Sequence, residues 1–223
     1  MGQKFVWLMG GVILIFTLLF LGYFLLLEIG GEEFKVWFKH AWEIIKTTLI
    51  DHGPLLFLSI AVLPGLVLPV APLLGLAGLW GGEHGPWLSC VYCTTALFIN
   101  LSWTYWVARG PARKILERIL SRSRFKLPDS SPVNMLEWAL ILRLTPGVPF
   151  IFTNYGLGLL RMPFLLYLLV SLPVLGFTAC GYVLAFAGIF GGEWKYIWTG
   201  ACIIAISLLL GRFAMKRKGA NAN

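Results

Sequence analysis

The chain has 223 residues, of which 58% are hydrophobic and only 13% are charged. A soluble domain has about 25% charged residues. The 13% of this chain are too few to cover a water-facing surface, so lipid must cover much of this protein. The formal net charge of +8 does not indicate a nucleic-acid binder, because the basic residues cluster between apolar stretches and at the C-terminal end, as they do on the cytoplasmic flanks of membrane spans.

The first fifty residues contain an apolar run and a mixed segment. Residues 5–27 are unbroken by charges, and at 1.5 Å per residue they extend about 35 Å, enough to cross a hydrocarbon core of about 30 Å. The run is too long for the apolar core of a signal peptide, so we expect a retained transmembrane helix. In residues 28–51, aromatic and apolar residues recur at helical spacing between charges, which predicts an amphipathic helix at the membrane interface.

The next apolar stretch, residues 54–82, is broken by prolines and glycines. Proline removes a backbone donor and interrupts a helix, so two short arms around a Pro-rich tip fit this stretch better than one straight span. We therefore predict a re-entrant hairpin here. Its expected breaks include Pro69, Pro72 and Gly78.

A full span is expected at residues 86–108, with Asn100 as its one strongly polar interior residue. Residues 109–126 then hold seven positive side chains against Glu117, which predicts a cytoplasmic helix on the anionic leaflet. A second broken stretch follows at 135–161, and further spans are expected at 163–190 and 194–213. The breaks of this second stretch are expected at Pro146, Gly147, Pro149, Gly156 and Gly158.

The basic clusters favour one topology. Suppose that each broken stretch returns to the side from which it entered, and that the four other spans cross the membrane. All of the basic clusters then fall on the same side, so both termini are expected in the cytoplasm. The predicted fold is an all-α integral membrane protein with an inverted repeat of two opposed re-entrant helical hairpins, four full spans and amphipathic interfacial helices. The alternative is that proline and glycine merely kink two ordinary helices.

One membrane domain is expected over residues 1–223. Its parts are an N-terminal span with an amphipathic helix (1–50), a core with re-entrant segments near 54–82 and 135–161 (51–190), and a last span with a basic tail (191–223). The expected location is a bacterial inner (plasma) membrane, with an organelle membrane as the alternative.

A longer motif lies in the second broken stretch. It reads Leu142-Arg143-Leu144-Thr145-Pro146-Gly147-Val148-Pro149-Phe150 and continues through Asn154-Tyr155-Gly156-Leu157-Gly158 to Met162 and Phe164. The motif resembles the hallmark of the DedA-like superfamily, also called VTT-domain or SNARE-associated Golgi proteins. The Asn154-Tyr155 pair suggests the Golgi vesicle-protein branch rather than DedA proper, and the resemblance covers roughly residues 50–190.

The resemblance implies two opposed re-entrant hairpins and a role in moving lipids between leaflets, by phospholipid scrambling or by recycling of polyprenyl-phosphate carriers. This sequence departs from the DedA pattern in two places. The first hairpin contains no Asp or Glu, and Pro149 stands where a second arginine is expected, although Arg143 matches the first. Passive scrambling needs fewer charges than proton-coupled handling of a phosphate carrier.

Arg143 is the principal candidate for headgroup binding. A charge in an apolar arm costs about 2.5–3.5 kcal/mol on insertion scales, and a guanidinium offers donors that suit a phosphate headgroup. The alternative is a structural clamp on carbonyls freed at the proline breaks, or a pair with Glu137. Asn154 and Tyr155 can supply further hydrogen bonds, either to a headgroup or to unwound backbone.

No enzyme is expected, because the motifs of metalloproteases, α/β-hydrolases and P-loop proteins are missing and no two carboxylates share an apolar stretch. No cofactor or metal site is expected, because the histidines are scattered and the cysteines lie in apolar stretches as free thiols. The expected partners are membrane lipids with anionic headgroups and no nucleic acid, and the sequence leaves a homo-oligomer open. The cysteines are Cys90, Cys93, Cys180 and Cys202.

The leading functional hypothesis is a lipid translocator or scramblase with Arg143, Asn154 and Tyr155 along a polar groove. A small-anion or solute transporter that uses the same Arg143 is the first alternative. The second is a non-transporting membrane-organising protein, whose basic segment 109–126 docks on anionic lipid.

Overall fold

A computed structural model describes residues 31–66, 68–122, 135–144 and 150–220, and the structural statements below concern these residues. Within them the secondary structure is helical and contains no strand, which confirms the predicted all-α class. The chain divides into two compact units, Met1–Asp51 and His52–Asn223, which are described separately. The span predicted at residues 5–27 and the break predicted at Pro146–Pro149 lie outside the described residues.

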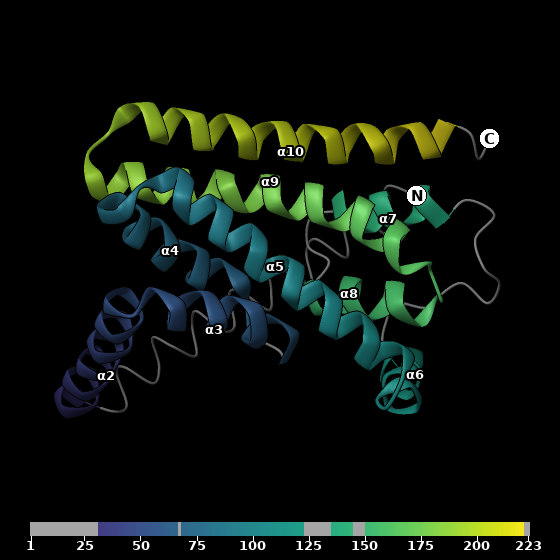
Figure 1. Ribbon diagram of the computed structural model, residues 1–223, viewed down its shortest axis with the longest axis horizontal. Coiled ribbons are helices and arrows are strands. Elements are labelled where there is room, and N and C mark those ends of the chain that lie inside the picture. Colours follow the sequence, from purple (N-terminus) through teal and green to yellow (C-terminus); the bar gives the residue numbers. More distant parts are fainter. Residues whose placement is uncertain (1–30, 67, 123–134, 145–149, 221–223) are drawn as a thin grey trace. The chain divides into compact units, whose positions relative to one another are not determined.

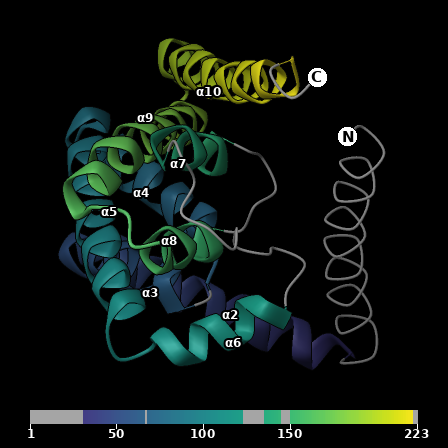
Figure 2. The same cartoon turned by 90° about the vertical axis from the view of Figure 1, so that its right-hand side faces the viewer.

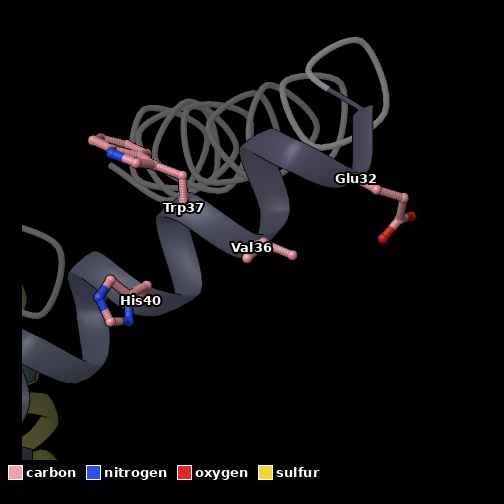
Figure 3. Close-up of a pocket in the computed structure, with 4 residues that line it drawn as sticks. All are labelled: Glu32, Val36, Trp37 and His40. Carbon is pink, nitrogen blue, oxygen red and sulfur yellow. The ribbon is translucent and has the colours of Figure 1, made fainter.

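The described part of the first unit is one amphipathic helix, α2 (Gly31–Asp51). Charged residues pair along it, as in the Lys35–Glu32 salt bridge of 2.8 Å, while large apolar side chains such as Trp42 and Ile45 are exposed. This mixture suits a helix that lies at a membrane interface. A shallow hollow of about 420 Å³ on this helix is lined by the outward-pointing side chains of Glu32, Val36, Trp37 and His40 (Figure 3).

The first broken stretch forms two short helices, α3 (Gly53–Leu66) and α4 (Val70–His84). Pro69 stands at the break as the N-cap of α4. Pro72 lies in the first turn of α4, where a helix does not need the N–H that proline lacks, and Pro64 lies inside α3.

Gly85 lies at the α4–α5 junction, where its φ of 110° favours glycine. The other helices of the second unit come after it in the chain. Two of them bracket the second broken stretch, α7 (Met135–Leu144) and α8 (Phe150–Leu159). The rest are α5 (Pro86–Arg109), α6 (Arg113–Arg122), α9 (Phe164–Gly191) and α10 (Trp194–Ala220).

Three glycines that were expected at breaks lie inside helices instead. Gly78 is in α4, and Gly156 and Gly158 are in α8. A Cβ on Gly78 would come within 2.5 Å of the Phe186 Cβ on α9, and one on Gly158 would lie 2.7 Å from the Ala108 Cβ on α5. Two of these glycines therefore permit close helix–helix approach, which is a common use of small residues in membrane proteins.

The second unit is built around two long helices, α5 and α9, which pack on one another. Helix α9 also contacts α4, α7 and α10, and it lies between α10 and α4 in both views (Figures 1 and 2). Helix α5 contacts α3, α4 and α8. The short helices on either side of each break are therefore held against long ones.

The surface of the second unit is suited to lipid. Helix α9 is the one described helix that is both long and apolar enough to cross a membrane by itself. Large apolar side chains on it are strongly exposed, including Leu165 at 73% and Leu169 at 72%. Since soluble monomers rarely expose large contiguous apolar patches, this surface agrees with a membrane environment.

Candidate functional site

A network of buried polar side chains crosses the middle of the second unit. Polar groups are expensive to bury unless they are hydrogen-bonded, so the positions of their partners define the site. The network joins α3, α5, α7, α8 and α9, which can be located in Figure 1. Its buried polar side chains are Asn100, Arg143, Thr153, Asn154 and Ser171.

Arg143, in the last turn of α7, is the centre of this network and is only 9% exposed. Its Nε donates to the Ser171 Oγ on α9 over 3.0 Å. Its Nη1 donates to the Thr153 Oγ1 over 2.9 Å and to the Asn154 Oδ1 over 2.6 Å, both on α8. One guanidinium therefore holds the two sides of the second break to each other and to α9, and all three of these partners are neutral.

From Asn154 the network continues into the first half of the second unit. The Asn154 Nδ2 donates to the Asn100 Oδ1 on α5 over 3.1 Å, and the Asn100 Nδ2 donates to the Ala61 carbonyl on α3 over 2.9 Å. The same carbonyl accepts the Trp103 Nε1–H at 2.8 Å. Ala61 lies three residues before Pro64, in the turn that a helical proline disrupts, so side chains of α5 supply donors to this turn.

Tyr155 makes a second link between the halves. Its hydroxyl donates to the Gly65 carbonyl at 2.7 Å. In a continuous helix this carbonyl would accept the N–H four residues later, but residue 69 is a proline and has no N–H. Tyr155 therefore replaces the donor that Pro69 lacks. Gly65 itself has little room, since a Cβ there would lie 2.3 Å from the Trp103 ring.

A third buried contact fixes the turn between α8 and α9. The Tyr105 hydroxyl donates to the Met162 carbonyl at 2.7 Å and accepts a hydrogen bond from the Arg109 Nη1 at 2.5 Å. The preceding residue, Arg161, has a φ of 56°, a left-handed conformation that is uncommon outside glycine. Tyr105 and Arg109 therefore hold a strained turn in place from the end of α5.

The structure brings two of the three predicted headgroup residues together. Arg143 and Asn154 are hydrogen-bonded, whereas Tyr155 is hydrogen-bonded to α3. The Glu137 side chain and the predicted breaks at Pro146, Gly147 and Pro149 lie outside the described residues. Gly156 and Gly158 lie in the same helix as Asn154 and Tyr155.

Sequence reasoning missed Thr153, Tyr167 and Ser171. The guanidinium Cζ of Arg143 lies 5.5 Å from the centroid of the Tyr167 ring, and Ser171 accepts its Nε–H. The available signal was the four-residue spacing of Tyr167 and Ser171, which places both on one face of an apolar helix. Helix α9 also carries other polar residues, so this spacing alone does not identify a partner for Arg143.

The hydrogen bonds of the cysteines among the described residues involve Cys90, Cys180 and Thr94, which are not members of this network. Cys90 and Cys93 are buried, Cys180 is partly buried and Cys202 is exposed, and all four are free thiols. The described residues contain no group of three or more His, Cys, Asp or Glu side chains that could hold a metal ion.

The fold and the buried polar network define a helical membrane protein in which a chain of hydrogen bonds leads from the buried Arg143 beside the second break to helix α3 of the first broken segment. The model of the VTT domain family matches residues 63–189, which is more than half of the chain. The chain therefore belongs to the VTT domain family, and the expected membership of the DedA/VTT superfamily is confirmed. The comparison with curated proteins gave no match, and neither did the comparison with solved structures.

Proposed function

We propose that this VTT-domain protein is a lipid translocator of the scramblase type. It moves phospholipid or polyprenyl-phosphate headgroups between leaflets and so supports membrane homeostasis. The observation that carries the proposal is the buried Arg143, which is hydrogen-bonded to Ser171, Thr153 and Asn154. These partners accept hydrogen bonds from three of the five guanidinium donors but do not balance its charge.

A buried charge without a counter-ion is unfavourable, and buried charges in proteins are normally paired. Among the described residues, the acidic side chains that form salt bridges are Glu32, Glu43 and Glu193, none of which contacts Arg143. A lipid phosphate that passes through the membrane supplies a negative charge that no salt bridge among the described residues gives to Arg143. In return, Arg143 lowers the cost of moving that phosphate across the apolar core.

The architecture supports two opposed re-entrant hairpins. Helices α3 and α4 have 14 and 15 residues, or about 21 and 22 Å, and α7 and α8 have 10 residues each, or about 15 Å. As far as the described residues extend, none of these four helices is long enough to cross a hydrocarbon core of about 30 Å by itself. Each pair enters and leaves on one side in the proposed topology.

The packing also supports an inverted repeat. The order α3–α4–α5 in the first half corresponds to α7–α8–α9 in the second, and the breaks share a pattern of paired prolines. Helix α4 packs on α9 and α8 packs on α5, so each short helix that follows a break contacts the long helix of the other half. Such an exchange is expected where two inverted halves meet around a pathway near the midplane.

The remaining proposals follow from charge and motif. The basic helix α6 supports a cytoplasmic position for that face and for both termini, in a bacterial inner membrane. The Asn154-Tyr155 pair supports the Golgi vesicle-protein branch. We propose no enzymatic activity, no cofactor, and membrane lipids as the partners.

A reconstitution experiment tests the proposal. Scrambling of a fluorescent phospholipid is measured in liposomes that contain wild type, Arg143→Ala or Arg143→Lys, with Lys114→Ala as a control that removes an exposed charge from α6. We expect fast loss of the protected inner-leaflet signal with wild type and the control, much slower loss with Arg143→Ala, and an intermediate rate with Arg143→Lys, which lacks the guanidinium fork. Wild-type liposomes that match empty ones, with phospholipids and polyprenyl-phosphates alike, would refute lipid translocation.

A small-anion transporter is the second candidate function, because the same buried cation suits a soluble anion. The two functions differ in how the ligand reaches the binding site. A translocator opens its site sideways to lipid tails, whereas a solute carrier encloses it. Anion flux in the absence of lipid scrambling would favour the carrier.

A further inference from the structure

Two buried polar atoms in the second unit have no hydrogen-bond partner of ordinary geometry among the described residues. They are the Nη2 of Arg143 and the hydroxyl of Tyr167. Arg143 is 9% exposed and Tyr167 is fully buried. Nearly all buried polar groups in proteins are hydrogen-bonded, so two exceptions at one place call for a physical reason.

The guanidinium has five N–H donors. Three of them are used, since Nε donates to Ser171 and Nη1 donates to both Thr153 and Asn154. The two hydrogens of Nη2 are left over. The positive charge and this free donor group are thus held in place by the neutral contacts on the other side of the guanidinium.

Tyr167 lies next to this free end. The Arg143 Cζ is 5.5 Å from the centroid of the Tyr167 ring. Tyr167 and Ser171 are four residues apart on α9 and so share one face of the helix, and Ser171 binds the Arg143 Nε. The Tyr167 hydroxyl can therefore act together with Nη2 on one ligand between α7 and α9.

The geometry selects among anions. A planar carboxylate is usually bound by two adjacent guanidinium nitrogens in parallel, but Nε and Nη1 are already occupied. What remains is one nitrogen with two hydrogens and one hydroxyl from another helix, so the donors approach from different directions. A tetrahedral oxyanion presents oxygens in different directions and fits this set better.

We infer that the Arg143 Nη2 and the Tyr167 hydroxyl form a phosphate-binding subsite between α7 and α9. The inference rests on the proposed function and deepens it, because it identifies the Arg143 nitrogen that binds the phosphate and adds Tyr167 as a second binding residue. It also assigns Asn154 and Tyr155 to positioning, since Asn154 bonds Arg143 and Asn100 while the Tyr155 hydroxyl bonds Gly65. The phosphate belongs either to a lipid headgroup or to a free anion.

The test compares two substitutions that each remove one hydroxyl. Tyr167→Phe removes the proposed ligand contact and leaves the ring over Arg143. Tyr105→Phe is the matched control, because its ring centroid is 5.1 Å from that of Tyr167, but its hydroxyl is bonded to Met162 and Arg109. The full chain is kept in an uncharged, phosphate-free detergent.

The thermal unfolding midpoint is then measured against increasing inorganic phosphate and, separately, against phosphatidylglycerol, with diacylglycerol as the phosphate-free lipid. A ligand that binds only the folded state raises the midpoint as its concentration increases. We expect Tyr167→Phe to keep the ligand-free midpoint and to bind phosphate about tenfold more weakly, a change of about 1.4 kcal/mol. Tyr105→Phe should lower the ligand-free midpoint and keep the wild-type affinity.

The two sources of phosphate give different results. Stabilisation by phosphatidylglycerol alone assigns the subsite to a lipid headgroup, and stabilisation by inorganic phosphate as well assigns it to a site that a free anion can reach. No stabilisation by either, or equal affinity in wild type and Tyr167→Phe, would overturn the inference. An unchanged affinity in Tyr167→Phe together with wild-type scrambling refutes the subsite alone. A Tyr167-dependent phosphate site in a protein that does not scramble refutes the proposed function alone.

Discussion

Tyr155→Phe tests whether the tyrosine hydroxyl replaces a backbone donor that the proline break removes. The substitution deletes one oxygen atom and leaves the Gly65 carbonyl without the hydroxyl that it accepts at 2.7 Å. Helical geometry offers that carbonyl no alternative, because the residue four positions later is Pro69. The loss should therefore be larger than for a side-chain pair that can find new partners.

The expected loss of unfolding free energy follows from two known energy ranges. An unsatisfied buried acceptor costs about 1–3 kcal/mol, and side-chain hydrogen bonds in one membrane protein average about 0.6 kcal/mol with a maximum of about 1.7. We expect Tyr155→Phe to destabilise the protein by about 1–2 kcal/mol, because the acceptor here is a backbone carbonyl and the residue four positions later is a proline. Chemical unfolding in detergent measures the change, and Tyr92→Phe, an exposed tyrosine on α5, is the control.

A double-mutant cycle refines this test. Pro69→Ala restores an N–H four residues after Gly65, and this N–H can replace the Tyr155 hydroxyl as donor where α3 extends past its present end at Leu66. The cost of Tyr155→Phe should then be smaller in the Pro69→Ala background. Unfolding of Tyr155→Phe at the wild-type midpoint, or an equal cost in both backgrounds, would refute the reasoning.

Two further predictions concern the packing and the network. Gly158→Ala should destabilise the protein by about 1–3 kcal/mol, because the new Cβ would lie 2.7 Å from the Ala108 Cβ. Gly191→Ala is the control, since a Cβ there meets nothing within 4 Å and the variant should unfold like wild type. Equal unfolding midpoints for both variants would contradict close α5–α8 packing. Replacing Asn100 and Asn154 by Leu, singly and together, should give a coupling free energy of about 1 kcal/mol in unfolding experiments, and additive effects would show that their 3.1 Å contact is not energetically significant.

The helix boundaries of two long segments could be predicted from the sequence, whereas the helix expected at 194–213 continues to Ala220. The expected span 86–108 is observed as Pro86–Arg109, and 163–190 as Phe164–Gly191. Both start next to a proline, a residue that is favoured at the first position of a helix. A long apolar run between such starts leaves little choice of secondary structure.

The positions of the true breaks were less predictable. Pro69 stands at the first break, but Gly78 and Gly158 lie within helices. Glycine lowers helix stability by only about 1 kcal/mol, and that cost is offset where the missing side chain lets two helices approach. The sequence alone does not show which neighbour is close enough to require a glycine.

The candidate site was predictable only in part. Arg143 and Asn154 stood out because charged and strongly polar residues are rare in apolar segments. The roles of Tyr167 and Ser171 depend on how α9 packs against α7, and that packing joins residues more than twenty positions apart. The link from Tyr155 to Gly65 spans ninety residues, so no local pattern indicates it.

We have proposed that Arg143, whose hydrogen-bond partners among the described residues are all neutral, serves a lipid phosphate. Asn154→Asp tests it most directly, because the new carboxylate takes the place of the amide oxygen that lies 2.6 Å from the Arg143 Nη1 and gives the guanidinium a counter-ion within the protein. We expect a folded protein whose phospholipid scrambling in liposomes is slowed about tenfold or more, since a buried ion pair competes strongly with a headgroup. Scrambling of Asn154→Asp at the wild-type rate would contradict it and would leave Arg143 as a structural clamp.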